Sequence, residues 1–460
     1  MPIAPSLGTQ KPNRRLVIVV RADPVICGHS GEARNLAEAA LHRGYDDVRI
    51  VTWPLDALTA LPLKPLDSVL PYSPGITVER PAPVGDYKVP DGRYIAGMVG
   101  RLVELFTDGV PTVCLSLYLT PHANAVNEAL SIAKAMGGPV NVTTIAEAVG
   151  SDITNVVRSC VETGAFGAAA SALVTYLAND RCVAVSEYTK QLIVAAARSV
   201  DEVLGTTFAP QCQSRVGISY PAVDTAAFTD IDPLQLDAAL ASRGLTVDGY
   251  VLFLSRITPA KGVDDLIDGY VRSGAKDHVR LVIAGTGVGR DRVMARAAAS
   301  GCAERIVFFD DVDDDEKRLL MAGSAAYALP SKPMPEFVET FGIALVEKML
   351  AGGGPIITTQ TGGIPEAIGD TALIVRPGCP ADITAALDTA ILHTDSETRD
   401  KAETAARTYA MQFDRQSVFD RLFAGLGVPI ALEVELAPDP DHESDVPLPV
   451  TPAAPVAMVA

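Results

Sequence analysis

The sequence predicts an α/β protein made of two doubly wound domains, each a sheet of parallel strands with helices between them. Short β-rich runs alternate with helical patterns, an order typical of parallel sheets. The alternation starts near Leu16, lapses over residues 222–233 and restarts at Tyr250. At 460 residues the chain is also too long for one ordinary core, so two domains are expected.

The first series opens with the apolar run LVIVV at residues 16–20, followed by a glycine turn and a helical pattern that ends near Gly44. VRIVTW is the second strand. Residues 54–95 are rich in proline and weakly periodic, which predicts long loops or an insertion. Further strands are expected in three places, at residues 112–117, 140–144 and 182–185.

The second series starts with a strand at residues 250–254 and a helix after Lys261 and Gly262. The segments LVIAG, IVFFD, AAYALP and PIITT are each strand-like and are separated by helical segments. We expect a hinge at residues 222–233. The predicted division begins with a flexible N-terminus at 1–13, a first domain at 14–228 and a second domain at 229–410. A C-terminal helix is expected at 411–426 and is a candidate to cross back to the first domain. Residues 427–460 are rich in proline, alanine and acidic residues, which predicts a disordered tail.

The composition disfavours several kinds of partner. Lys and Arg number 38 against 56 Asp and Glu, a net charge of −18, which argues against nucleic acid and anionic membranes. The longest apolar runs are of strand length, so integral membrane association is not expected. Residues 1–13 lack the apolar core of a signal peptide. The seven scattered cysteines form no CxxC motif, which predicts reduced thiols, no metal site and a cytoplasmic location.

The segment at residues 335–368 is the most informative part of the chain. It holds Glu339 and Glu347 with seven residues between them, and a helix-forming run opens near Gly342. The first N–H groups of that helix are unpaired and can face an anion. A carboxylate just before the helix can hold sugar hydroxyls, and one inside it can hold a ribose diol. Two such carboxylates also fit glycoside hydrolysis, but the flanking glycines favour binding of a sugar joined to a nucleotide by a diphosphate.

Two cations and a glycine loop follow strands of the second series. Arg256 lies just past a strand end and Lys261 beside a glycine that opens a helix, where ligands of doubly wound sheets collect. Two such cations can neutralise a diphosphate, although solvated surface charges would look the same. Gly285 and Gly287 permit close backbone approach or simply a tight turn. The loop lacks the full dinucleotide pattern, which disfavours hydride transfer.

His29 and His122 are the histidines whose positions are suggestive. His29 stands beside the first glycine turn, and His122 follows the strand-like segment CLSLYL. Either can serve in acid–base chemistry, but a single histidine at such a position is also compatible with a structural role.

Taken together and in this order, these segments resemble retaining glycosyltransferases of family 4, which have the GT-B fold. The resemblance covers roughly residues 16–426 and is strongest at 250–377. It rests on SRITPAKGVDDLI, LVIAGTG, IVFFDDVDDDEKRLLMAGSAAYALPS, ETFGIALVEKMLAGGGPIITTQTGGIPEAI, VAVSEYTKQLI and SYPAVDTAAF. It implies two Rossmann-like domains that face a cleft, with a nucleotide-diphosphate sugar as donor and no cofactor or metal.

The resemblance also implies a role for each matching residue. Arg256 and Lys261 would bind the donor diphosphate, and Glu339 would hold sugar hydroxyls; these are the expected catalytic residues. Glu347 would hold the ribose hydroxyls. The remaining expected donor-binding positions are Gly28, Gly285, Gly287, Val312 at the base, Thr340, Phe341, Gly342 and Ile343.

The chain departs from the family pattern in three places. The family usually has a histidine where this chain has IAEAV at residues 145–149, so Glu147 joins His29 and His122 as a tentative acceptor-side residue. The first turn is CGHSG rather than a double glycine. Lys348 and Gly353 also replace commoner residues.

The resemblance implies a retaining, metal-independent transfer of a sugar to a small-molecule or sugar acceptor. The departing phosphate oxygen can take the acceptor proton, so a strong base is not essential. Two alternatives within enzymes are a nucleotide-sugar epimerase and a phosphorylase of the same fold. The alternative from another class is a sugar-nucleotide-binding protein without turnover.

Overall fold

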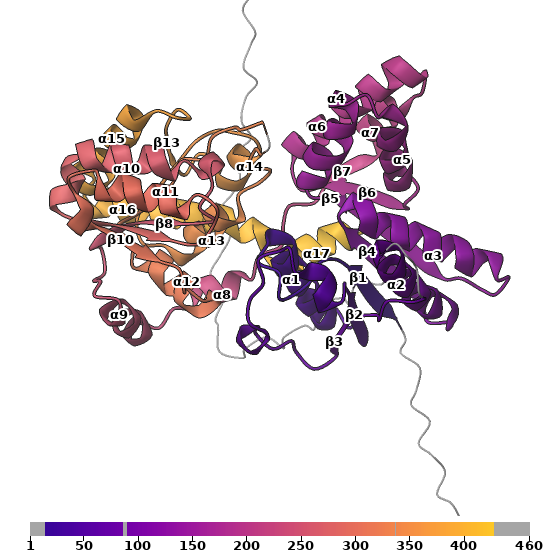
Figure 1. Ribbon diagram of the computed structural model, residues 1–460. Helices are drawn as coiled ribbons and strands as arrows, with labels where there is room; N and C mark the ends of the chain where they lie inside the picture. The colour runs from indigo at the N-terminus through magenta and orange to yellow at the C-terminus, as the bar shows by residue number, and fades with distance from the viewer. Residues whose placement is uncertain (1–13, 86–89, 336, 427–460) are drawn as a thin grey trace, which may run out of the picture.

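The computed structural model describes residues 14–85, 90–335 and 337–426 and shows two α/β lobes (Figure 1). The sheet of the first lobe has the strand order β3-β2-β1-β4-β5-β6-β7, and that of the second has β10-β9-β8-β11-β12-β13. All neighbouring strands are parallel. The strands are β1 (Arg15–Val19), β2 (Asp47–Val51), β3 (Ile76–Glu79), β4 (Thr112–Leu117), β5 (Val142–Ala148), β6 (Arg181–Ala184), β7 (Val216–Ile218), β8 (Tyr250–Leu254), β9 (Arg280–Ala284), β10 (Ile306–Phe309), β11 (Ala326–Leu329), β12 (Ile356–Thr358) and β13 (Leu373–Ile374).

Helices connect successive strands and cover the faces of the two sheets. In the first lobe they are α1 (Gly28–His42), α2 (Pro90–Thr107), α3 (Asn124–Ala135), α4 (Ser159–Glu162), α5 (Phe166–Leu177), α6 (Glu187–Leu204) and α7 (Phe208–Arg215). After β7 come α8 (Thr225–Thr229), α9 (Pro233–Ser242), α10 (Val263–Arg272), α11 (Arg290–Ala298), α12 (Asp314–Ala322), α13 (Ile343–Ala351), α14 (Ile364–Ile368), α15 (Pro380–Asp388), α16 (Ser396–Ala410) and α17 (Arg415–Phe423).

The central strands are mostly apolar because both faces of each sheet are covered. Every residue of β1 is buried, and Leu16 pairs with Val48 on one side and Val113 on the other. In a parallel sheet all the carboxyl ends lie at one edge, so the loops after the strands converge there. The loops that carry most of the predicted site residues therefore meet at one edge in each lobe.

The proline-rich residues 54–95 contain one strand that the sequence did not predict. The strand β3 pairs with β2 at the end of the sheet and is only partly buried, so its apolar pattern is weak. The segment before it is held against the lobe. The Arg34 guanidinium donates to the Pro71 carbonyl at 3.0 Å and lies 3.9 Å from the Tyr72 ring centre. The predicted loop is thus fixed in place by α1.

The chain passes between the lobes twice, and the two passages lie side by side. Val223 donates its N–H to the Phe413 carbonyl at 2.9 Å, and Arg415 donates to the Val223 carbonyl at 2.9 Å. The helix α8 lies within the expected hinge, and its Phe228 packs in the core of the second lobe.

The helix α17, yellow in Figure 1, packs on the first lobe. The Tyr45 and Phe419 ring centres are 5.8 Å apart, and Arg43 forms an ion pair with Asp420 at 2.6 Å. The expectations for residues 1–13 and 427–460 fall outside the described residues. Of the helices in the described ranges, none is long and apolar enough to cross a membrane.

Candidate functional site

The loops after β8 and β9 form one hydrogen-bonded unit that presents Arg256. Ile257 donates its N–H to the Thr286 carbonyl at 2.8 Å. A side chain at Gly285 would lie 2.1 Å from the Ser255 carbonyl oxygen, and one at Gly287 would lie 2.5 Å from the Ile257 oxygen. The two glycines are required because backbone passes where a Cβ would stand. The Arg256 carbonyl accepts from the Thr258 N–H at 3.1 Å, but its exposed guanidinium has no ion pair or hydrogen bond with any residue in the described ranges.

Lys261 and Glu339 are 78 positions apart in the sequence, and the fold joins them as an ion pair. Both side chains are nearly buried, with 9% and 12% of their surfaces exposed. The Lys261 ammonium also lies 5.0 Å from the Phe337 ring centre. The resemblance assigns Lys261 to the diphosphate and Glu339 to the sugar hydroxyls. In the structure the Lys261 ammonium and the Glu339 carboxylate are in contact.

The backbone around Glu339 is held by the loop that follows β12. Gly363 donates its N–H to the Glu339 carbonyl at 2.9 Å. A Cβ at Gly362 would lie 1.9 Å from that same oxygen, and one at Gly363 would lie 2.0 Å from the Thr340 carbonyl. Gly362 and Gly363 therefore have a packing role, whereas their position beside Glu339 and Glu347 in the sequence predicts a role in ligand binding.

The helix α13 begins directly after this backbone, at the boundary between the lobes. Its N-cap is Gly342, whose φ of 109° is left-handed. As in any α-helix, the N–H groups at the start of α13 have no carbonyl one turn earlier in the helix to bind. A Cβ at Gly28, the first residue of α1, would lie 3.1 Å from Ile343 Cδ1. The amino ends of α1 and α13 thus meet across the two domains, and both favour an anion.

Thr340 and Phe341 fix this arrangement from either side. Thr340 donates its hydroxyl to the Val149 carbonyl of the first lobe at 3.4 Å. The Phe341 ring is buried and stacks 5.5 Å from the Tyr220 ring. Its side chain belongs to the core, so only the backbone of Phe341 is available to a ligand.

Glu347 and Val312 lie at the other end of the candidate donor site. Glu347 is in the second turn of α13, and its Oε1 accepts a hydrogen bond from Lys317 Nζ at 2.6 Å. Val312 follows β10 and stands just before the N-cap of α12, Asp313, whose side chain accepts from the Glu316 N–H at 2.7 Å. The acidic first turn of α12 suits the positive end of that helix.

His122 is buried and both of its ring nitrogens are engaged. Nε2 accepts from Trp53 Nε1 at 2.8 Å, and Nδ1 lies 3.0 Å from the Leu117 carbonyl. This pattern requires the neutral tautomer with the proton on Nδ1. Burial lowers the pKa of His122 to about 4. The residue therefore has a structural place in the first lobe rather than a free basic nitrogen.

His29 lies at the domain boundary, next to two arginines. Burial, then the charges of Arg21, His122 and Arg256, lower its pKa to about 3. Its Nδ1 is buried, and no described residue donates to it or accepts from it. Arg21 lies 5.4 Å from the Tyr118 ring centre. Arg21 and Tyr118 follow β1 and β4, and sequence reasoning missed them because nothing in the local pattern marks either residue.

Glu147 is fully buried at the end of β5, opposite Glu32 of α1. Both carboxyl oxygens of Glu147 and Oε1 of Glu32 lack a hydrogen-bond donor among the described residues. Burial raises the pKa of Glu32 to about 7. Burial, then the charges of Glu32 and Asp152, raise the pKa of Glu147 well above its ordinary range. Glu147 is therefore an interior group and does not face an acceptor in this conformation.

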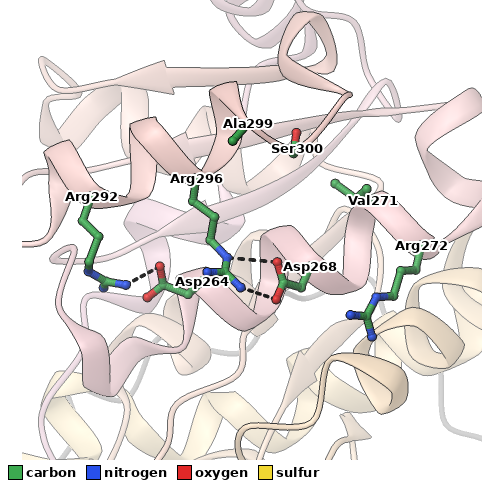
Figure 2. Close-up of a pocket in the computed structure, with 8 residues that line it drawn as sticks. All are labelled: Asp264, Asp268, Val271, Arg272, Arg292, Arg296, Ala299 and Ser300. Carbon is green, nitrogen blue, oxygen red and sulfur yellow. Dashed lines mark hydrogen bonds and ion pairs between the residues drawn. The ribbon is translucent and has the colours of Figure 1, made fainter.

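A separate groove of about 510 Å³ lies between α10 and α11 (Figure 2). Its carboxylates are already paired: Arg292 with Asp264 at 2.5 Å, and Arg296 with Asp268. None of the predicted site residues lines it. In the part of the chain that the structure describes, no group of three or more His, Cys, Asp and Glu side chains is placed to hold a metal ion.

These contacts bring two cations, Arg256 and Lys261, and two helix amino ends to a candidate site between two parallel α/β domains, with the carboxylates of Glu339 and Glu347 beside them. Cations and helix amino ends favour an anion, and carboxylates can accept hydrogen bonds from hydroxyls. Residues 244–409 match the family described as glycosyl transferases group 1.

Among curated proteins, the chain is similar to D-inositol 3-phosphate glycosyltransferase from Jonesia denitrificans, with 32% identity over 211 residues that cover 43% of this chain and 48% of the relative. Phosphatidyl-myo-inositol mannosyltransferase from Mycobacterium leprae is 31% identical over 191 residues, which cover 37% of this chain and 49% of the relative. The chain spans about half the length of the curated relatives it matches.

Among solved structures, HepE from Anabaena in complex with UDP and glucose has a TM-score of 0.62 and 17% identity, covering 90% of this chain and 99% of that chain. WaaG, a glycosyltransferase involved in lipopolysaccharide biosynthesis, has a TM-score of 0.58 and 16% identity, covering 89% and 100%. At such identity the likeness shows the fold, and it confirms the GT-B fold that the sequence predicts.

Proposed function

We propose that the chain is a retaining glycosyltransferase that moves a sugar from a nucleotide-diphosphate sugar to a small-molecule or sugar acceptor without a metal. The observation that carries the proposal is the Lys261–Glu339 ion pair beside the amino end of α13, opposite Gly28 of α1. The group 1 match over residues 244–409 supports the donor half. The two curated relatives named above are sugar transferases by name, and HepE was solved with UDP and glucose.

In the proposed reaction, Arg256 and Lys261 neutralise the diphosphate as its charge grows during departure. Glu339 accepts hydrogen bonds from the sugar hydroxyls, and Glu347 accepts them from the ribose. The bond between the anomeric carbon and the phosphate oxygen breaks while the acceptor oxygen bonds to that carbon from the same face. The departing phosphate oxygen takes the acceptor proton. The buried placement of Glu147 and the engaged nitrogens of His122 support a mechanism without a strong protein base.

We place this reaction in the cytoplasm. All seven cysteines are free thiols, which supports a reducing compartment. Donor base, sugar and acceptor are left open in the proposal, and a screen of nucleotide sugars by thermal shift identifies the donor, because a ligand that binds only the folded chain raises its Tm.

Arg256→Ala and Glu339→Ala test the proposal. We expect each variant to lose transfer by about 10²–10³-fold, because each removes a group that stabilises charge or orientation at the reacting centre. Arg256→Ala also weakens nucleoside diphosphate binding. The measurement is transfer from the donor identified by thermal shift, with the anomeric configuration of the product read by NMR.

The matched control is Arg292→Ala, an arginine of the same domain that lines the separate groove and is half exposed. Full activity in both site variants would refute the assignment. An inverted anomeric product would refute the retaining mechanism. Donor binding without turnover in the unmodified chain would favour the sugar-nucleotide-binding protein, an alternative that the lack of a histidine in residues 145–149 also favours.

A further inference from the structure

The proline-rich segment before β3 has no part in the reaction described above, yet the structure fixes it beside the candidate donor site. Val25 and Leu63 form an antiparallel bridge. Ile26 donates its N–H to the Pro62 carbonyl at 2.9 Å, and Lys64 donates to the Pro24 carbonyl at 2.8 Å. Residues 62–64 therefore run beside residues 24–26, which lead directly into Gly28. This places Lys64 at the edge of the first lobe that faces the second.

Lys64 reaches across the boundary to Asp314 in the first turn of α12. Its Nζ lies 2.5 Å from Asp314 Oδ2, and both side chains are about one-third exposed, at 32% and 39%. Burial raises the pKa of Asp314, but Lys64, Lys317 and Arg34 outweigh it and hold the pKa below its ordinary value. Asp314 is thus an ionised carboxylate between cations of both domains, two positions from Val312.

The next cation in this series is Lys317, one turn further along α12. It follows Asp314 by three positions on α12, where side chains at this spacing are neighbours, and it donates to Glu347 Oε1 at 2.6 Å. Its Nζ also lies 5.3 Å from the Phe228 ring centre, which limits where the ammonium can move. Lys317 and Glu347 are 23% and 14% exposed, so their charges are weakly screened. Oε1 of Glu347 is occupied, and Oε2 is the oxygen that remains for a diol.

We propose that residues 62–64 form the nucleoside-side wall of the donor site, and that the alternating charges Lys64, Asp314, Lys317 and Glu347 tie this wall to the carboxylate that holds the ribose. The inference rests on the proposed function, since it assigns a specificity role at the same donor site. Lys64, Asp314 and Lys317 are positioning residues: they act through Glu347 and through closure of the first domain on α12.

The direction of the coupling follows from the alternation of charge. When Lys64 is absent, Asp314 loses its paired cation and attracts Lys317 more strongly, so that Lys317 donates less effectively to Glu347. Oε1 of Glu347 then hydrogen-bonds to water, and the carboxylate is no longer held in one orientation. The nucleoside therefore binds less tightly, while the groups at the reacting carbon, Lys261 and Glu339, are unchanged. The expected signature is a higher donor KM at nearly constant kcat.

The test measures donor KM, kcat and nucleoside diphosphate affinity by calorimetry, with UDP, GDP and ADP as probes. Lys64→Met and Asp314→Asn should each raise KM and Kd by about two- to five-fold, the range for a partly exposed ion pair, because each removes the pair that closes residues 62–64 on α12. The double variant should lose no more than either single one, because both act on one interaction. Lys64→Arg should retain affinity. Lys317→Met should lose about ten-fold or more, because Glu347 then lacks its donor.

The control variant is Lys401→Met, which removes the exposed i,i+4 pair with Glu397 in the same domain. It should leave every constant unchanged. Unchanged affinity in Lys64→Met and Asp314→Asn, or losses that simply add in the double variant, would overturn the inference while leaving the proposed function intact. If the unmodified chain binds none of the three nucleoside diphosphates, the proposed function fails and the inference fails with it.

Discussion

At the scale of single residues, the Glu32–Glu147 pair constrains how the first domain responds to pH. Both side chains are almost fully buried, at 2% and 0% exposure, and no cation faces them among the contacts that set their pKa values. Two ionised carboxylates side by side are costly in such a place, even with the backbone hydrogen bond that Ala222 gives to Glu32. One proton placed between them removes a charge and supplies the missing donor. The folded chain therefore holds a proton here at pH values where the unfolded chain has lost it.

The first prediction at this scale concerns stability against pH. Both folded pKa values are raised, to about 7 for Glu32, so the folded state binds more protons than the unfolded state above pH ~4.5. The stability contributed by protonation is complete below that pH, and it is lost as the pH rises through the folded values. Glu147→Gln supplies an amide donor and should raise the free energy of unfolding at pH 8 by about 1–3 kcal/mol. Denaturant unfolding at pH 5 and pH 8 measures it.

The matched control for that prediction is Glu128→Gln, at an exposed position on α3. It should leave the difference between pH 5 and pH 8 unchanged, whereas Glu147→Gln should reduce it. An unaltered difference in Glu147→Gln would show that the pair does not hold an extra proton.

The predicted residues of the candidate site show which of its features can be predicted from a sequence and which cannot. Arg256, Lys261 and Glu339 follow strand ends or precede a helix, and such positions were enough to nominate them. The pairing of Lys261 with Glu339 depends on where two loops converge in space, and no local pattern encodes it. Glu147 stands near the end of a strand, but only the packing of α1 decides whether its side chain faces solvent or the interior.

At the scale of secondary structure elements, Lys348 explains two departures from the family pattern together. Its side chain is 1% exposed, and Nζ donates to the Met321 carbonyl at 2.7 Å and to Ser324 Oγ at 2.9 Å. It also contacts the Gly352 and Gly353 carbonyls, each at 2.5 Å. The unusual lysine and the unusual glycine therefore touch each other. Lys348 joins the carboxyl ends of α12 and α13, where unpaired carbonyls favour a cation.

Lys348→Met should destabilise the second domain by about 3 kcal/mol or more, because several buried carbonyls lose their donor at once. The Tm of that domain in calorimetry should fall by roughly 6–12 °C. Lys401→Met, which alters a lysine that is 74% exposed in the same domain, is the control and should leave the Tm in place. A Tm that stays unchanged in Lys348→Met would mean that the carbonyls find other donors and that the lysine does not join the helices.

Strands could be predicted from the sequence where a continuous apolar run marks them. Buried strands such as β1 and β8 are continuous apolar runs, so both were found from the sequence. The strand β3 was missed because it is short, partly polar and flanked by prolines. The strand β5 was expected to end at residue 144 and continues to Ala148, since its later residues are buried on both faces. Burial on both faces follows from tertiary packing, which periodicity does not reveal.

At the scale of the whole molecule, the two domains touch on several sides of the candidate site. Glu366 of α14 provides the most specific contact: its Oε2 accepts from the Glu187 N–H at 2.8 Å, and its Oε1 accepts from the Tyr188 N–H at 3.1 Å. These are the first two residues of α6, so a carboxylate of the second domain caps a helix of the first. Such a cap combines charge-assisted hydrogen bonds with the positive end of the helix.

Glu366→Ala should therefore shift the chain toward an open arrangement. Loss of two charge-assisted hydrogen bonds costs about 1–3 kcal/mol of closure, which changes the ratio of closed to open molecules by roughly 5–150-fold. The radius of gyration from small-angle scattering should increase, and kcat should fall because Gly28 and Ile343 no longer meet across the site. A saturating nucleoside diphosphate should restore part of the closure, since it binds both domains.

The control is Glu202→Ala, which changes an exposed residue at the far end of α6 and should leave the radius of gyration and kcat unchanged. An unchanged radius and kcat in Glu366→Ala would show that the cap does not hold the domains together, and closure would then rest on other contacts between the domains, such as those of Thr340 and Lys64.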